Sequence, residues 1–150
     1  MSMTWTQYLL SKLAEEAVEV AKEAMKCQQQ GVASQYKGRN AIFELRNELI
    51  EVMAVAQLVG DETDVVNALG QYRIVHLPSE SEDDDFHDIK FAKVGRLFYH
   101  AMFAYQAGTV DVSRSRFQHI KDAAIRYGAK HNLPYCGDIT YRGDSSGPNL

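Results

Sequence analysis

Apolar residues recur at helical spacing along most of the chain, and the first such stretch is the longest. Residues 5–30 contain neither proline nor glycine, and on a wheel of ~100° per residue their apolar side chains fill one broad face. Thr4 and Gln7 fit a capping box at the start, and Gly31 supplies a stop at the end. The pattern predicts one long helix. Its apolar face holds Leu9, Leu10, Leu13, Ala17, Val20, Ala21 and Ala24, and its acidic stripe holds Glu15, Glu16, Glu19 and Glu23.

A second amphipathic stretch follows, with acids on or beside its packing face. Asn40 is a suitable N-cap for a helix over 41–59, and Gly60 is expected to end it. One stripe of this helix holds Glu44, Glu48, Glu51, Val55 and Leu58 in chain order. Because apolar residues flank and continue the stripe, we expect these acids to lie near the protein interior, away from the side that carries Arg46 and Gln57.

The rest of the chain shows further helical patterns. Helices are predicted over 61–76, over 86–107 and from a cap at Asp111 or Ser113 to the neighbourhood of His131. Strand signals are nearly absent. The expected fold is therefore all-α: a bundle of about five helices, in one domain over 1–131, completed by dimerisation.

Two segments do not fit this helical pattern. Residues 79–88 carry six acids, and we interpret their beginning, 79–85, as a solvated acidic linker. Residues 132–150 contain two prolines and three glycines, and we expect an irregular C-terminal tail.

Composition narrows the class of protein. The chain has 150 residues, of which 45% are hydrophobic, which is typical of a globular protein. A net charge of −4 argues against general nucleic-acid binding. No apolar run approaches the ~20 residues that cross a bilayer, and no secretory signal precedes the first helix. Two cysteines without a CxxC spacing predict neither a disulfide framework nor a zinc site. We expect a cytoplasmic protein.

The two acidic stripes predict a divalent-metal site. Glu16 and Glu19 are three residues apart, as are Glu48 and Glu51, so each pair can direct two carboxylates to one spot. If the two helices pack antiparallel, all four carboxylates meet. Mg²⁺ and Mn²⁺ prefer such oxygen ligands and leave room for water and phosphate. The alternative is a solvated acidic face paired with Lys12, Lys22 and Lys26.

These residues also resemble the MazG-like all-α nucleoside triphosphate pyrophosphohydrolases, which have dimeric dUTPases and phosphoribosyl-ATP pyrophosphohydrolases among their relatives. Residues 15–19 match an EExxE motif, and 48–51 match ExxD except that Glu51 replaces the usual Asp. The resemblance covers roughly residues 8–60, the stretch that contains the two motifs. Residues 10–16 further resemble MazG-like proteins encoded by phages, for which the location would be the host cytoplasm.

The resemblance implies Mg²⁺-dependent hydrolysis of a nucleoside triphosphate to the monophosphate and pyrophosphate. Glu16, Glu19, Glu48 and Glu51 would hold Mg²⁺, with Mn²⁺ as a substitute, and Glu15 would orient or deprotonate the attacking water. The resemblance also implies a homodimer or tetramer. A protein of this fold that binds a nucleotide without hydrolysing it remains an alternative, since Glu51 departs from the motif. A third possibility is a purely structural bundle.

Basic residues are candidates for contact with the phosphates. Lys93, Arg96 and His100 fall on one side of the predicted helix over 86–107, with Lys90 at the edge of that side, and Lys12 lies in the acidic stripe. An ordinary solvated basic face is the alternative interpretation. No membrane partner and no specific nucleic acid are expected.

Overall fold

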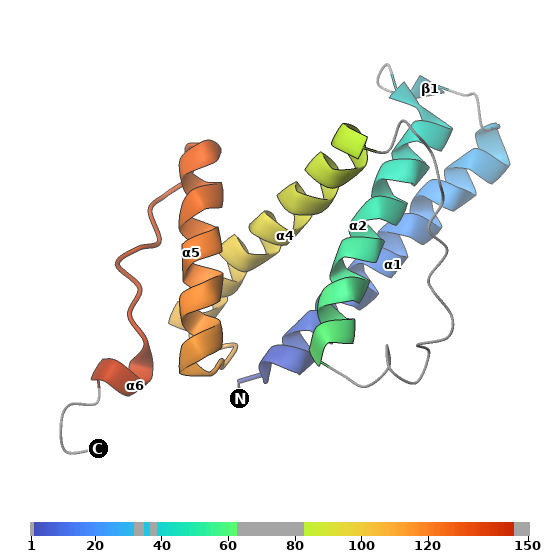
Figure 1. The fold of residues 1–150 in the computed structure, drawn as a ribbon. Helices are drawn as coiled ribbons and strands as arrows, with labels where there is room; N and C mark the ends of the chain where they lie inside the picture. The colour runs from blue at the N-terminus through green and yellow to red at the C-terminus, as the bar shows by residue number, and fades with distance from the viewer. Residues whose placement is uncertain (1, 32–34, 37–38, 63–82, 146–150) are drawn as a thin grey trace. The chain divides into compact units, whose positions relative to one another are not determined.

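The computed structural model describes residues 2–31, 35–36, 39–62 and 83–145, and these are predominantly α-helical (Figure 1). The helices are α1 (Trp5–Gln30), α2 (Ala41–Glu62), α4 (Asp83–Gln106), α5 (Arg114–Lys130) and the short α6 (Arg142–Ser145). Two-residue strands β1 (Gln35–Tyr36) and β2 (Arg39–Asn40) pair antiparallel between α1 and α2. The predicted all-α class is confirmed. The predicted helix over 61–76 lies outside the described residues, except for Asp61 and Glu62, which end α2.

The chain forms two compact units. One unit is Leu9–Lys93, and the other combines residues 1–8 with Val94–Leu150. Helices α1 and α4 each contribute residues to both units. None of the helices in the described ranges combines the length and the apolar content needed to cross a bilayer.

The ends of α1 follow the predicted signals. The backbone N–H of Thr4 donates to Oε1 of Gln7 at 2.9 Å, and the N–H of Gln7 donates to Oγ1 of Thr4 at 3.1 Å. This is the reciprocal capping box, which pairs two donors that the first turn would otherwise leave unsatisfied. At the other end Gly31 has φ 90° and its N–H donates to the carbonyl of Cys27 at 3.0 Å. A residue with a side chain is strained at this φ, so glycine suits the helix end.

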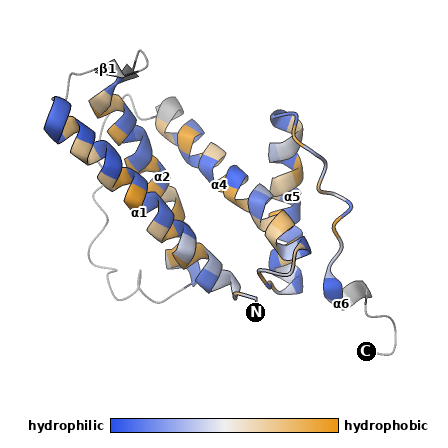
Figure 2. Ribbon diagram, turned by 180° about the vertical axis from the view of Figure 1, so that it is seen from behind, coloured by the Kyte–Doolittle hydropathy of each residue, from blue (hydrophilic) through white to orange (hydrophobic). Residues whose placement is uncertain are grey.

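Helices α1 and α2 run antiparallel in the unit Leu9–Lys93 (Figure 1). Asn40 caps α2 as predicted, since its Oδ1 accepts the N–H of Ile42 at 3.1 Å. Hydrophobic and hydrophilic positions alternate along both helices in Figure 2, as amphipathic packing requires. Among the described residues of this unit, the buried side chains are Leu9, Glu16, Cys27, Ala41, Ile50, Ala54, Val55 and Val59.

Two predicted boundaries are wrong. Helix α2 continues through Gly60 to Glu62, because a helix tolerates an internal glycine at a cost of only about 1 kcal/mol when packing favours its continuation. Helix α4 begins at Asp83, so residues 83–85 are helical and are not part of a linker. Aspartates suit the first turn of a helix because they complement its dipole.

Close approach of α4 and α5 organises the other unit, and two glycines permit it. A Cβ added at Gly95 would lie 2.8 Å from Cδ2 of Tyr127, and one added at Gly128 would lie 3.0 Å from Cε1 of Tyr99. Each glycine therefore lies under a tyrosine ring of the opposite helix. The two rings lie 5.9 Å apart, and the hydroxyl of Tyr99 donates to the carbonyl of Pro134 at 2.6 Å.

Ser113, one of the two predicted caps, begins α5: its Oγ accepts the N–H of Arg116 at 3.4 Å. Asp111 instead pairs with the guanidinium of Arg142 and accepts the hydroxyl of Ser2 at 2.6 Å. These contacts lower the pKa of Asp111, the Ser2 hydrogen bond most and Arg142 next.

The segment between α5 and α6 is irregular, but it packs against the rest of its own unit. Cys136 and Ile139 are buried. The Arg142 guanidinium lies 3.7 Å from the centre of the Tyr105 ring and donates to the Tyr105 carbonyl at 2.5 Å. These contacts anchor the segment that the sequence pattern described only as a tail.

Candidate metal centre

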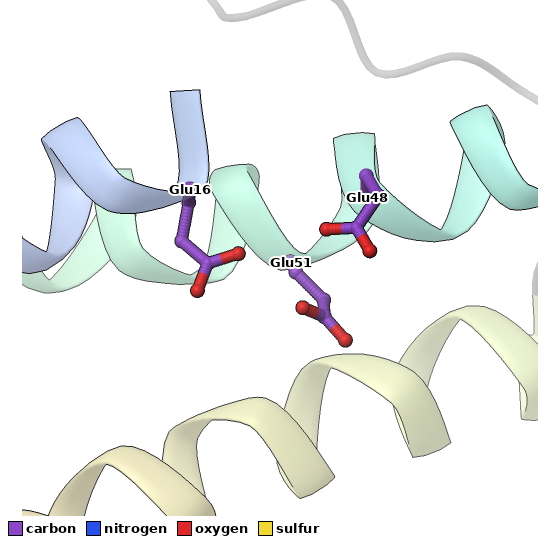
Figure 3. Close-up of side chains that lie close together, drawn as sticks. All are labelled: Glu16, Glu48 and Glu51. Carbon is purple, nitrogen blue, oxygen red and sulfur yellow. The ribbon is translucent and has the colours of Figure 1, made fainter. Parts of the chain in front are cut away.

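Three glutamates from two helices meet in the unit Leu9–Lys93. Glu16 extends from α1, and Glu48 and Glu51 extend from successive turns of α2 (Figure 3). Each contributes one carboxylate oxygen to a group in which all three oxygens lie within 4.8 Å of one another. The antiparallel packing of two helices, each with an acid on its packing side, produces this meeting.

Glu16 is the most unusual member of this acidic cluster, which we define as Glu16, Glu48 and Glu51. Its exposed fraction is 6%, and it is the one buried charged residue of the part of the chain that the structure describes. One oxygen, Oε2, is fully buried and has no hydrogen-bond partner. A buried carboxylate oxygen without a partner is costly, so this atom marks a position where a cation would be stabilising.

Lys93 of α4 brings a positive charge to the cluster. Its ammonium contacts Oε1 of Glu16 and lies 3.8 Å from Oε2 of Glu51. The Lys93 side chain is only 11% exposed. One ammonium therefore faces two carboxylates directly, in surroundings where water screens the charges weakly.

Glu48 shows how crowded the negative charge is. Its pKa is raised from the ordinary 4.5 to about 7, first because burial disfavours the charged form and next because of the Glu51 and Glu16 carboxylates. Glu19 and Glu23 add smaller contributions in the same direction. Like charges held close together oppose ionisation, and a divalent cation would relieve that repulsion.

The structure places the other acids of the predicted site outside the cluster. Glu19 forms an ion pair with Lys22 at 3.2 Å, and Glu15 forms one with Lys12 at 3.2 Å. The Glu15 side chain is 61% exposed. Both pairs lie along α1, as the salt-bridged alternative described. Of the four predicted metal ligands, Glu16, Glu48 and Glu51 come together.

The predicted basic residues occupy different surroundings. Lys93 lies in the cluster. The Lys12 ammonium is engaged by Glu15. The Lys90 ammonium lies 5.9 Å from the centre of the Phe86 ring. Arg96 is an exposed residue in the part of α4 that belongs to the other unit.

Sequence reasoning found Lys93 as a basic residue but not as the partner of Glu16 and Glu51. The helical wheel of 86–107 shows only which residues share a face, and it gives no information about which carboxylates that face meets. The spacing of Glu48 and Glu51 within α2 predicted their meeting because that pair is local, whereas the same spacing placed Glu19 in the site and the structure does not. The Lys93 contact depends on tertiary packing between distant segments, for which the sequence offers no short-range signal.

The donor set fits a hard divalent cation. Three carboxylates in a partly buried group match the oxygen ligands of Mg²⁺ and Mn²⁺, which usually also keep water or phosphate as ligands. The unpartnered Oε2 of Glu16 and the raised pKa of Glu48 both indicate more negative charge than the described side chains compensate.

Comparison with known proteins adds nothing to this geometry: no protein-family model, no curated protein and no solved structure matches the chain.

Proposed function

We propose that the chain is a Mg²⁺-dependent nucleoside triphosphate pyrophosphohydrolase, which adds water across a phosphoanhydride bond to give a nucleoside monophosphate and pyrophosphate. The observation that carries the proposal is the buried Glu16 carboxylate, with its unpartnered oxygen, facing Glu48 and Glu51. The order and spacing of these acids resemble the MazG-like motifs, which supports the choice of substrate class.

Glu16, Glu48 and Glu51 are the residues that would hold the metal, and Glu19 is a further candidate on the basis of the motif. A divalent cation held there would neutralise phosphate charge and lower the pKa of a bound water. The protein would contribute position and electrostatic stabilisation. Glu15 lies next to the buried Glu16 in sequence and is largely exposed, so its carboxylate is accessible to orient a water and accept its proton.

A second candidate function is nucleotide binding without hydrolysis. The observation that favours it is the Glu15–Lys12 ion pair, because a carboxylate that contacts an ammonium is less available to orient a water. Glu51 in place of the usual aspartate also supports it, since the longer side chain would move the metal relative to the substrate.

Pyrophosphate release tests the proposal. A panel of ribo- and deoxyribonucleoside triphosphates would be incubated with Mg²⁺ or Mn²⁺, using wild type, Glu48→Gln and Glu23→Gln. Glu23 is a matched control because it pairs with Lys26 at 3.0 Å on α1 and lies outside the cluster. Turnover that Glu48→Gln abolishes and Glu23→Gln retains supports the hydrolase. Saturable nucleotide binding by wild type without turnover supports the second candidate. If folded wild type shows neither turnover nor nucleotide binding, both candidate functions are wrong.

We propose further that the chain forms a homodimer or a higher oligomer. Large apolar side chains of α1 and α2 are exposed, at Leu10, Val18, Met25, Ile42, Phe43 and Leu49, with exposed fractions between 43% and 55%. Exposed apolar surface on two neighbouring helices is typical of an interface. Light scattering measures the mass directly, and Val18→Lys should shift an oligomer towards monomer. A monomeric wild type would disprove this part of the proposal.

A further inference from the structure

Lys93 contacts two of the carboxylates that would hold the proposed metal. Its ammonium contacts Glu16 and lies 3.8 Å from Glu51, and both carboxylates belong to the acidic cluster. An ammonium and a divalent cation compete for the Glu16 and Glu51 carboxylates, because each would draw on their negative charge. The two cations also repel each other over a few ångströms in a weakly screened site.

Charge balance explains why Lys93 is held there in the absence of a metal. Without the ammonium, the Glu16 carboxylate would be buried opposite Glu48 and Glu51 and would lose its one ion pair among the described residues. The ammonium leaves part of this need unmet, since Oε2 of Glu16 still has no partner. A cation of higher charge density would satisfy more of the carboxylate oxygens than the ammonium does.

Release of Lys93 from Glu16 would make its ammonium available to a phosphate group. A lysine side chain has four rotatable methylene bonds and can relocate its ammonium without backbone movement. Once displaced from Glu16, the ammonium would remain at the edge of the site, where the phosphates of a metal-bound nucleotide would lie. Lysine is a common phosphate ligand in proteins.

We infer that Lys93 is a displaceable internal cation: it occupies the acidic cluster in the metal-free protein, leaves Glu16 when a divalent cation binds, and then contacts the polyphosphate. This inference rests on the proposed function for the identity of the site and of the polyphosphate. It adds that metal and polyphosphate binding are coupled through one side chain, since the lysine becomes available to phosphate only after the metal has displaced it.

Metal binding without any nucleotide gives the first test. Mn²⁺ alone would be titrated against wild type and Lys93→Met, with free Mn²⁺ measured by electron paramagnetic resonance. Removal of the competing ammonium should tighten Mn²⁺ binding on the order of tenfold. Lys93→Arg, which keeps the charge, should stay close to wild type. Lys26→Met, which removes a charge paired with Glu23, should leave the affinity unchanged.

The polyphosphate arm uses inorganic tripolyphosphate at saturating Mn²⁺. Lys93→Met should bind it about tenfold more weakly than wild type does, because a charged partner is lost. Tighter Mn²⁺ binding with unchanged tripolyphosphate affinity would overturn the phosphate contact. Mn²⁺ affinity that is unchanged or weaker in Lys93→Met would overturn the displacement itself.

A measurement on the wild-type protein guards against a variant that does not fold. The Cε resonances of the lysines would be followed by nuclear magnetic resonance during a Mg²⁺ titration, with Lys93 assigned by its loss in Lys93→Arg. The Lys93 resonance should move as Mg²⁺ binds, and a stationary resonance during saturation would overturn the inference. Displacement of Lys93 by Mg²⁺ without pyrophosphate release from nucleotides would support the inference and reject the hydrolase. Pyrophosphate release without displacement of Lys93 would support the hydrolase and reject the inference. A protein that binds no divalent cation would reject both.

Discussion

Glu16 on α1 and Glu48 on α2 offer carboxylate oxygens within 4.8 Å of each other, although they belong to different helices. Two carboxylates so close oppose each other's ionisation. Burial is the first cause of the raised pKa of Glu48, the Glu51 carboxylate is the second and the Glu16 carboxylate is the third. Glu16 also contacts the Lys93 ammonium. The negative charge of the site is therefore incompletely balanced, and single-residue variants can measure its effect on stability and on metal binding.

Glu16→Gln should remove metal-dependent stabilisation. A ligand at about one hundred times its Kd stabilises the folded state by about 2.7 kcal/mol, which corresponds to a rise in Tm of about 5–10 °C for a chain of this size. We expect this rise with Mn²⁺ for wild type. The glutamine variant keeps the shape of the side chain but loses its charge, so the rise should disappear.

Differential scanning calorimetry with and without Mn²⁺ checks this prediction. Glu23→Gln, which removes an acid from the same helix outside the cluster, should keep most of the rise, because Glu23 makes only a smaller contribution to the charge around Glu48. If Glu16→Gln retained the rise and Glu23→Gln lost it, the metal would bind elsewhere on α1.

The raised pKa of Glu48 makes stability depend on pH. The carboxyl releases its proton at about 7 in the folded protein and at the ordinary 4.5 when unfolded. Below 4.5 it is protonated in both states. As the pH rises to about 7 the unfolded chain loses this proton while the fold retains it, so the free energy of unfolding falls. Because water partly screens Glu48, we expect a loss of about 1–2 kcal/mol.

The measurement is urea denaturation from pH 4 to pH 8 in the presence of a chelator, for wild type and Glu48→Gln. The glutamine variant lacks the titrating group, so its free energy of unfolding should increase relative to that of wild type as the pH rises across this range. Since other groups titrate in both proteins, the difference between the two curves is the relevant quantity. Parallel curves would show that Glu48 is not perturbed.

The sequence predicted the parts of this site that depend on local spacing. Glu48 and Glu51 share a stripe because they are three residues apart in a helix, and the cap at Asn40 fixed where that helix begins. Glu19 has the same spacing from Glu16, but Lys22 pairs with it one turn away. A wheel assigns both acids to one stripe, with about 60° between them, and it cannot decide which of them reaches the interior.

The fold was predictable to a similar extent: the sequence indicated local features such as helix ends, but not the packing of distant helices. Glycine and cap residues located several helix ends of the described chain, and the positive φ of Gly31 agrees with the predicted stop there. Gly60 shows the limit, because a glycine signals a possible end and packing decides whether the helix stops. Contacts such as that of Lys93 with Glu16 depend on how distant helices pack, and no local pattern encodes them.

Glu15→Gln should separate catalysis from metal binding. Glu15 lies outside the acidic cluster and pairs with Lys12, so its loss should leave Mn²⁺ affinity within about twofold of wild type, as for a removed surface ion pair. If it orients or deprotonates water, kcat should fall by a factor of about 10²–10⁴. Steady-state pyrophosphate release alongside Mn²⁺ titration gives both quantities. Unchanged kcat would assign the base to another group, and weakened metal binding would make Glu15 a ligand.

Gly95→Ala tests the close approach of α4 and α5. In an exposed helix interior this substitution would stabilise by about 1 kcal/mol. Here the new methyl would lie 2.8 Å from Cδ2 of Tyr127, whose ring is confined by Tyr99 at 5.9 Å and His131 at 4.3 Å. Because the ring has little room to retreat, we expect a net loss of about 1–3 kcal/mol in the free energy of unfolding.

Urea denaturation of Gly95→Ala, Tyr127→Ala and the double variant measures this clash as a coupling between the two sites. Truncation of Tyr127 removes the atoms that the methyl meets, so the alanine at position 95 should cost nothing or stabilise in that background. Additive effects, or a stabilised single Gly95→Ala variant, would show that the two helices have room for a side chain at this position.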